Sequence, residues 1–382
     1  MPAIDLCQCS AAFVRTGERC FMVDQVTEPA VSDKHREHII AQAIDQLIEE
    51  SGVNWQKPII ARLLETSLGL GLDGTEKLDL KISSAALQEM RNAYRLFAPY
   101  VSVPKVTIFG SARTKLHDPL SKQAEQVSRM LATQGWMVVT GAGPGIMEAA
   151  TIGAGQDQAL GVSIKLPFEE HPNHVIAHND RLVSMKYFFT RKLMLVKESS
   201  GFICLPGGFG TLDEAFELLT LQQTGKMVPV PIVLLDRPGG SFWRGFESFA
   251  IEHLERNGMI SAGDLDRVLV TDSVEAAASE ITGFWRNYDS LRWHNDQLVL
   301  RLQSEPTDEE VEMLNEKFAH LIRSGSIVKT EPLTPEVRDD DRLELPRIVF
   351  EPQPRAVGEL FRVIRALNEL ASAPSRAQPP AV

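Results

Sequence analysis

The chain has 382 residues, enough for two or three domains of ordinary size. Hydrophobic residues make up 43% of it, charged residues 24% and aromatic residues 7%, proportions that exclude collagen-like, disordered and coiled-coil proteins. The 39 Lys and Arg residues against 51 Asp and Glu residues give a net charge of −12, so we expect no nucleic-acid partner, although a small anion can still bind in a locally positive pocket. No apolar run approaches the roughly 20 residues that cross a bilayer, and we expect no membrane partner.

The first twenty residues contain Cys7, Cys9 and Cys20. A structural zinc site would need a second cysteine pair or a nearby histidine pair, and because neither is present the favoured interpretation is reduced thiols. The segment also differs from a secretory signal, because Asp5 precedes any Lys or Arg. We therefore expect a cytoplasmic protein.

Residues 1–100 are predicted to form a helical N-terminal region. Apolar residues recur at helical spacing over 33–52, 55–68 and 83–97. The glycine-rich stretch 68–77 is predicted to be a loop between the last two helices. No catalytic constellation is visible in this region.

Residues 101–289 alternate between short apolar runs and amphipathic helical patterns. The runs are VTIFG, WMVVTG, LGVSI, GFICLPGG, VPIVLLD and RVLVT. This repetition predicts an α/β domain with a doubly wound, Rossmann-like, mostly parallel sheet. In such sheets ligands bind beyond the carboxyl ends of the strands, so we expect the functional site at the strand-to-helix turns.

Residues 290–372 are predicted to form a small α+β domain with the order strand, helix, strand, helix. Thr307 and Glu310 have the spacing of a capping box at the start of its first helix. The acidic, proline-bearing stretch 331–346 is expected to be flexible, and residues 373–382 are expected to form a disordered tail.

Glycine-bearing turns follow three of the predicted strands, at residues 109–112, 140–145 and 205–211. Glycine lets backbone N–H groups approach a phosphate closely, and the dipole of the following helix favours a negative charge. The turns predict an anion-binding site with contributions from Gly110, Ser111, Gly141, Gly143, Gly145, Gly207, Gly208, Gly210 and Thr211. The glycine spacing differs from the dinucleotide fingerprint and the Walker Gly-Lys-Ser/Thr is missing, so NAD binding and ATP hydrolysis are disfavoured and no cofactor is expected.

Residues 206–214, PGGFGTLDE, match the PGGxGTxxE signature of the LOG family of nucleotide phosphoribohydrolases. The segment 185–192 is similar to the Met-x-x-Arg-Lys helix of that family and keeps the Arg-Lys pair, although its surroundings depart from the shorter plant form. The Gly110-Ser111 turn and residues 138–150 also resemble the family. The similarity spans residues 104–285, and the added flanks resemble the longer bacterial members.

The resemblance implies hydrolysis of the N-glycosidic bond of a nucleoside 5′-monophosphate, with AMP as the leading substrate and N6-substituted AMP, a cytokinin ribotide, as the second. It implies that Arg191 and Glu214 are the catalytic pair. It implies substrate contacts from Met185, Lys192, Thr220 and the loop 207–213, including Asp213. It also implies a homo-oligomer, a dimer or larger. The older family label of lysine decarboxylase finds no independent support, because nothing in the sequence argues for a pyridoxal phosphate lysine.

The residue types suit this chemistry. A carboxylate such as Glu214 stabilises the positive charge that builds on ribose as the bond breaks, and it can accept a proton from water. Arg191 offers a planar fork to phosphate or ribose oxygens. In simpler interpretations, Glu214 is an acidic residue that the helix dipole stabilises, and Asp213 only caps the helix. The alternative function is a nucleotide sensor or carrier that binds its ligand at these turns without hydrolysing it. An oxidoreductase is the least favoured class.

Other side chains have simpler interpretations. His171, His174 and His178 suggest a metal site, but their spacing differs from the i, i+4 pair of a helical zinc site, and no metal is expected. Glu148 and Glu217 are interpreted as surface or supporting residues. The aromatic run 187–189 could face a subunit interface, but helical spacing favours the core.

Overall fold

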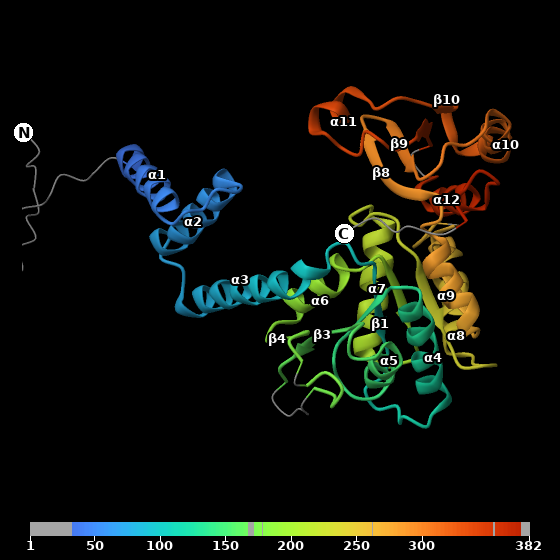
Figure 1. Ribbon diagram of the computed structural model, residues 1–382, viewed down its shortest axis with the longest axis horizontal. Helices are drawn as coiled ribbons and strands as arrows, with labels where there is room; N and C mark the ends of the chain where they lie inside the picture. Colours follow the sequence, from blue (N-terminus) through green and yellow to red (C-terminus); the bar gives the residue numbers. More distant parts are fainter. Residues whose placement is uncertain (1–32, 167–171, 178, 262, 354–355, 376–382) are drawn as a thin grey trace, which may run out of the picture. The chain divides into compact units, whose positions relative to one another are not determined.

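The computed structural model describes residues 33–166, 172–177, 179–261, 263–353 and 356–375 (Figure 1). The chain divides into two compact units, Met1–Ile82 and Ser83–Val382. The domain boundaries expected after residues 100, 289 and 372 stay predictions. Cys7, Cys9 and Cys20 lie outside the described residues. None of the described helices is both long and apolar enough to cross a membrane.

The first unit contains helices α1 (Asp33–Glu50) and α2 (Lys57–Leu72) and the start of α3 (Lys77–Phe97), which ends in the second unit. The predicted loop over 68–77 is wrong for its first half, because α2 continues through Gly69 and Gly71 to Leu72. Each glycine costs a helix only about 1 kcal/mol relative to alanine, and the leucines between them favour the helix.

The second unit is built on a fully parallel sheet with the strand order β4-β3-β2-β1-β5-β6-β7. The strands are β1 (Lys105–Phe109), β2 (Met137–Thr140), β3 (Ala159–Ile164), β4 (Leu182–Met185), β5 (Gly201–Cys204), β6 (Ile232–Leu235) and β7 (Val268–Thr271). The order grows outward from β1 in both directions, which confirms the predicted doubly wound α/β class. One strand is missing from the elements predicted from the sequence: β4 is a four-residue edge strand in which Ser184 is exposed.

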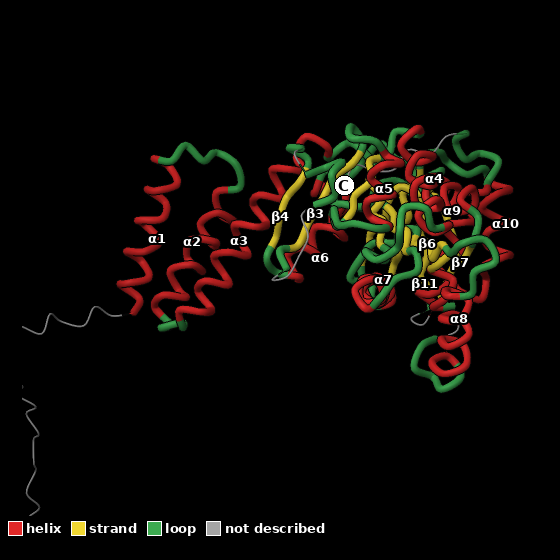
Figure 2. The backbone as a smooth tube through the Cα atoms, turned by 90° about the horizontal axis from the view of Figure 1, so that it is seen from below, coloured by secondary structure: helices red, strands yellow, loops and turns green. Residues whose placement is uncertain are grey.

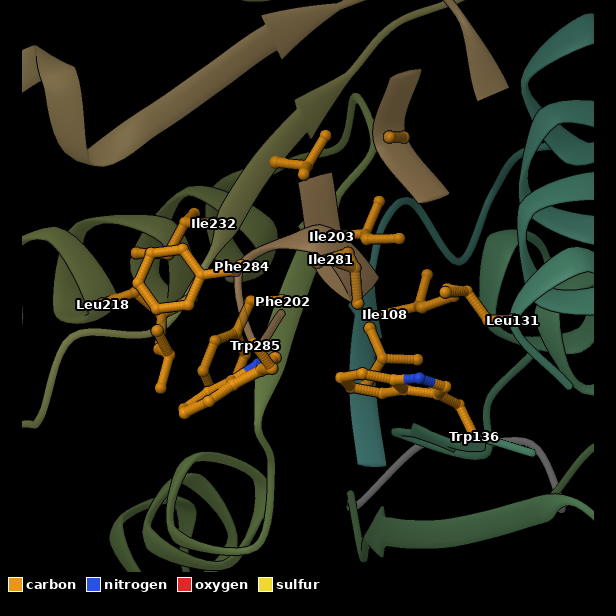
Figure 3. Packing of buried hydrophobic residues seen from close by; sticks show 14 of the residues in the cluster. Ile108, Leu131, Trp136, Phe202, Ile203, Leu218, Ile232, Ile281, Phe284 and Trp285 are labelled. Atoms are coloured by element: carbon orange, nitrogen blue, oxygen red, sulfur yellow. The ribbon is translucent and has the colours of Figure 1, made fainter. Parts of the chain in front are cut away.

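Helices cover both faces of this sheet. On one face α4 (Pro119–Thr133) packs against α5 (Ile146–Ala154) and α9 (Val274–Gly283). The helices α6 (Phe188–Lys197), α7 (Phe209–Gln223) and α8 (Phe242–Phe249) run along the other face (Figure 2). Because both faces are covered, β1, β2 and β5 are buried along their whole length. Figure 3 shows Ile108 and Phe202 of the central strands with Leu131 of α4 on one side and Leu218 of α7 on the other.

A smaller antiparallel sheet follows, with the order β10-β11-β9-β8. Its elements are β8 (Tyr288–His294), β9 (Gln297–Leu302), α10 (Asp308–Phe318), β10 (Ile322–Lys329), α11 (Thr334–Asp339), β11 (Arg347–Pro352) and α12 (Leu360–Glu369). The predicted α+β character is present, and the capping box of Thr307 and Glu310 is confirmed. Three of these elements, β8, β10 and α11, are additional to those predicted from the sequence. Short 3₁₀ or π segments complete the described elements at Ala98–Tyr100, Ala250–Glu255, Asp264–Arg267, Ala319–Leu321 and Ala356–Glu359.

The acidic stretch 331–346 differs from the flexible connection that was expected. Its Glu336 is buried and forms ion pairs with Arg301 at 2.7 Å and Arg347 at 2.9 Å. A buried carboxylate needs such partners, and they tie this stretch to β9 and β11. The chain beyond α12 is also held, because Arg286 donates a hydrogen bond to the carbonyl of Pro374. The predicted disorder of 376–382 lies outside the described residues.

Candidate active site

The three glycine-bearing turns meet around one cavity at the carboxyl ends of β1, β2 and β5. The cavity has a volume of about 1020 Å³, and residues from all three turns line it. Ser111 links the turns, since its N–H donates to the carbonyl of Pro206 at 3.3 Å and its carbonyl accepts from the N–H of Ile146 at 3.0 Å. The expectation that the site lies at the strand-to-helix turns therefore has a structural basis in this cavity.

The turn at residues 140–145 is tightly held. Ala142 has a φ of 58°, a backbone conformation that L residues seldom adopt. Asn173 stabilises it by donating hydrogen bonds from its backbone N–H and its Nδ2 to the carbonyl of Ala142, at 2.9 and 3.2 Å. A Cβ on Gly145, which has a φ of 70°, would lie 2.4 Å from the carbonyl oxygen of Ser111. The backbone of this turn is therefore held in place, and a side chain at Gly145 would overlap the backbone of Ser111.

The turn at residues 206–211 is open at Gly208 and Gly210, although a Cβ on Gly207 would lie only 2.2 Å from Oγ1 of Thr211. A Cβ on Gly208 or Gly210 would meet nothing within 4 Å, and the side chain of Phe209 is 93% exposed. Helix α7 begins here with Gly208 as a cap that offers no side-chain acceptor. The first N–H groups of a helix have no partner within the helix, so an anion can accept hydrogen bonds from this end of α7.

Arg191 extends from α6 into the cavity lining. Its Nε donates to the carbonyl of Val162 at 3.0 Å, which fixes the guanidinium at the end of β3. A Cβ on Gly141 would lie only 2.1 Å from the Nη2 of Arg191. Gly141 thus leaves the space in which the arginine side chain lies.

Glu214 lies in the second turn of α7 and also lines the cavity. It is 6% exposed, and within the part of the chain that the structure describes its Oε2 is buried without a hydrogen-bond partner. This burial raises the pKa of Glu214 to about 7, although the positive charges of Arg191 and Lys192 act to lower it. Near neutral pH the carboxyl group can therefore exist in both protonation states, as a general acid or base requires.

Lys192 is held between two carboxylates of α7. Its Nζ lies 2.9 Å from Oδ2 of Asp213 and 2.5 Å from Oε2 of Glu217. Asp213 belongs to the cavity lining, whereas Lys192 does not. The two contacts tie α6 to α7.

Four of the predicted substrate contacts lie away from the cavity lining: Gly145, Met185, Lys192 and Thr220. Met185 ends strand β4 and is buried in the core, so the expected helical position of this residue is wrong. Thr220 is exposed on α7, and its hydroxyl donates to the carbonyl of Phe216 at 2.7 Å. Their contacts with a substrate stay predictions.

The structure adds cavity residues that the motifs did not indicate: Arg113, Met147, Ser163, Lys165, Pro172 and Phe188. Ser163 and Lys165 lie at or just beyond the carboxyl end of β3, where the rule for ligand sites in parallel sheets could have found them. The core assignment of the aromatic run is wrong for Phe188 and Phe189, which are 53% and 55% exposed. Met194 and Leu195 occupy the core-facing side of α6 instead.

His174 contacts Glu148, with Nδ1 and Oε1 2.8 Å apart. This contact joins the segment that contains Asn173 to the first turn of α5. The other two residues of the histidine cluster, His171 and His178, lie outside the described residues.

Comparison with known proteins agrees with the motifs. The model of a family described as "possible lysine decarboxylase" matches residues 145–281. The chain is 32% identical over 171 residues to the cytokinin riboside 5′-monophosphate phosphoribohydrolase of Mycobacterium tuberculosis, which covers 44% of this chain and 87% of that protein. It is 30% identical over 167 residues to the protein of the same name from Mycobacterium marinum, with the same coverage of 44% and 87%. A solved molybdenum cofactor binding protein from Rippkaea orientalis matches 45% of this chain and 91% of its own at 24% identity, with a TM-score of 0.32.

The two mycobacterial relatives are thus matched over most of their length. The residues that match the family model include Arg191 and Glu214. The chain belongs to the LOG family, the family of these phosphoribohydrolases.

Proposed function

We propose that this chain hydrolyses the N-glycosidic bond of a nucleoside 5′-monophosphate to release the free base and ribose 5-phosphate. AMP is the leading substrate, and N6-substituted AMP is the second. The observation that carries the proposal is the buried carboxyl group of Glu214, with a pKa of about 7, in the same cavity as Arg191 and the uncapped start of α7. The names of the mycobacterial relatives support the same reaction class.

The 5′-phosphate binds at the open turn before α7. The free N–H groups of the helix start donate to it, and the helix dipole favours its charge. Arg113 and Lys165 add positive charge to the same cavity, which offsets the negative charge of the whole chain locally. The apolar side chains of Met147 and Phe188 leave a surface suited to a base.

The reaction needs one water and no covalent intermediate. As the bond between C1′ and the base nitrogen breaks, its electron pair leaves with the base and positive charge builds on the ribose ring. Ionised Glu214 stabilises this charge and accepts a proton as the water oxygen bonds to C1′. Overall, OH is added to C1′ and H to the base. Arg191 orients the phosphate or ribose oxygens through its planar fork.

The test measures free base and ribose 5-phosphate released from AMP, GMP, CMP, UMP and N6-substituted AMP by the full chain. Glu214→Gln keeps the size of the side chain and replaces its ionisable carboxyl group with an amide, so we expect kcat to fall about a thousandfold. Glu247→Gln, on α8 and outside the cavity, is the matched control with unchanged kcat. A wild-type chain that binds AMP and releases no base from any of these nucleotides would instead be a nucleotide sensor or carrier.

A further inference from the structure

The start of helix α6 receives its cap from another helix. The N-terminal cap residue Tyr187 makes no side-chain cap hydrogen bond. Glu89 of α3 supplies the acceptor instead: its Oε1 accepts from the N–H of Lys186 at 2.9 Å, and its Oε2 accepts from the hydroxyl of Thr190 at 2.7 Å. The N–H of Tyr187 lies 3.4 Å from the same Oε2. One carboxylate therefore engages three donors around the first turn of α6.

These contacts are shielded from water. Glu89 is 9% exposed and Thr190 is fully buried. A hydrogen bond to an ionised acceptor is stronger than one between neutral groups, and a carboxylate at the start of a helix also interacts favourably with the helix dipole. The position and rotation of α6 at this end thus depend on Glu89.

Arg191 directly follows Thr190, the residue whose hydroxyl Glu89 holds. Its guanidinium lies in the narrow space beside Gly141, where a single added carbon would overlap it. A shift of α6 by a fraction of an ångström moves this side chain, and displacements of about 1 Å in an active site can cost about a hundredfold in rate. The placement of Arg191 is accordingly sensitive to the contact between α3 and α6.

We propose that Glu89 is a positioning residue for nucleotide cleavage, acting through Arg191 from a helix that precedes the first strand of the sheet. The inference rests on the proposed function of the cavity. Glu89 lies outside residues 145–281, the part of the chain that matches the family model. The N-terminal flank therefore takes part in the reaction through the residue that it orients, beyond any role in folding.

The test is a double-mutant cycle on the full chain with AMP as substrate. Glu89→Gln retains the shape of the side chain but loses its charge and places an amide NH₂ against one of the donors, so we expect kcat to fall about tenfold to a hundredfold. In an Arg191→Lys background we expect Glu89→Gln to have little further effect on kcat, because the guanidinium that Glu89 positions is absent. Asp79→Asn, at an exposed acid in the first turn of α3, is the control and leaves kcat unchanged.

An equal fold-decrease in kcat in both backgrounds shows a purely structural role and overturns the inference, as does full activity of Glu89→Gln. If Glu89→Gln does not fold, Thr190→Val replaces it in the cycle, because it removes the hydroxyl donor at nearly constant volume. If the wild-type chain releases no base, the proposed function fails separately. The cycle is then run on the Kd for AMP by calorimetry, where Glu89→Gln weakens binding only in the presence of Arg191.

Discussion

The turns at residues 140–145 and 206–211 look alike in the sequence and behave differently in the structure. Both follow a buried strand, precede a helix and are rich in glycine. In the first turn a Cβ would overlap the Ser111 backbone at Gly145 and the guanidinium of Arg191 at Gly141, while at Gly143 it would meet only the end of the Met147 side chain. In the second, Gly208 and Gly210 face open space at the start of α7. The first turn leaves the space that Arg191 occupies, whereas we expect the open glycines of the second turn to bind a ligand.

This difference shows that glycine in such turns has two separate causes. Glycine is required for packing where a Cβ would overlap the protein itself, and it is required for binding where a Cβ would keep a ligand away from the backbone. Substitutions at Gly141 and Gly145 in the first turn should therefore affect folding or the position of Arg191, whereas substitutions at Gly208 and Gly210 in the second should affect ligand affinity without a loss of stability. The following predictions test this distinction, from the largest effect to the smallest.

Gly145→Ala should destabilise the chain by about 4 kcal/mol, because it combines an unfavourable positive φ with overlap of the Ser111 backbone. The free energy of unfolding from urea denaturation measures it. Gly155→Ala is the matched control, because Gly155 has a φ of 76° but a Cβ there would meet nothing within 4 Å. This variant should lose only the free energy that a positive φ costs alanine, about 1–2 kcal/mol. Equal losses in the two variants would show that packing at residue 145 is unimportant.

The buried carboxyl group beside the open turn should make stability depend on pH. The pKa of Glu214 is raised to about 7 in the folded chain, so between its ordinary value of 4.5 and 7 the folded state binds more protons than the unfolded state. Stability therefore falls as pH rises through this window, by about 3 kcal/mol at most. Activity should rise as the pH passes through about 7, because the carboxylate of Glu214 forms there in the folded chain.

Measured denaturation curves at pH 5 and pH 8 check the stability part. Glu214→Gln should remove this contribution and leave a chain that is more stable than wild type at pH 8 and catalytically inactive. If the variant has the same pH dependence as the wild type, Glu214 does not carry the raised pKa.

Gly141→Ala should lower the rate of base release about a hundredfold, because the added carbon displaces the guanidinium of Arg191. Gly143→Ala, in the same turn, is the control. Its Cβ would meet only the end of the flexible Met147 side chain, at 2.7 Å from Cε, so a loss of less than tenfold is expected. Comparable losses in kcat would mean that the whole turn, and not the arginine, is the sensitive element.

Gly210→Ala should raise stability by about 0.5–1 kcal/mol, because alanine favours a helix over glycine and the position is open. The KM for AMP should increase at the same time, since the methyl group obstructs approach to the backbone at the start of α7. Urea denaturation and steady-state kinetics measure the two effects. A destabilised variant with an unchanged KM would contradict the ligand role of this turn.

Much of the fold could be predicted because it depends on local pattern. Six of the seven parallel strands are apolar runs ended by Gly, Pro or Asp, and the capping box of Thr307 and Glu310 depends on a spacing of three residues. The strand β4 escaped prediction because it is short and partly exposed at the edge of the sheet. The contact of Glu89 with α6 escaped because its partners are 97 to 101 residues away along the chain.

The sequence by itself determined that the three glycine turns lie together at strand-to-helix junctions, because parallel strands bring their carboxyl ends to one edge, and the family resemblance added Arg191 and Glu214 to this site. Only the tertiary structure decided at which glycines a Cβ would overlap the protein and at which it would meet open space, since this depends on the atoms opposite each one. It also decided that Glu214 is buried deeply enough to raise its pKa to about 7. The burial of the Glu214 carboxyl group and the close contacts of the glycines depend on elements that are far apart in the chain. The local sequence pattern therefore does not encode them.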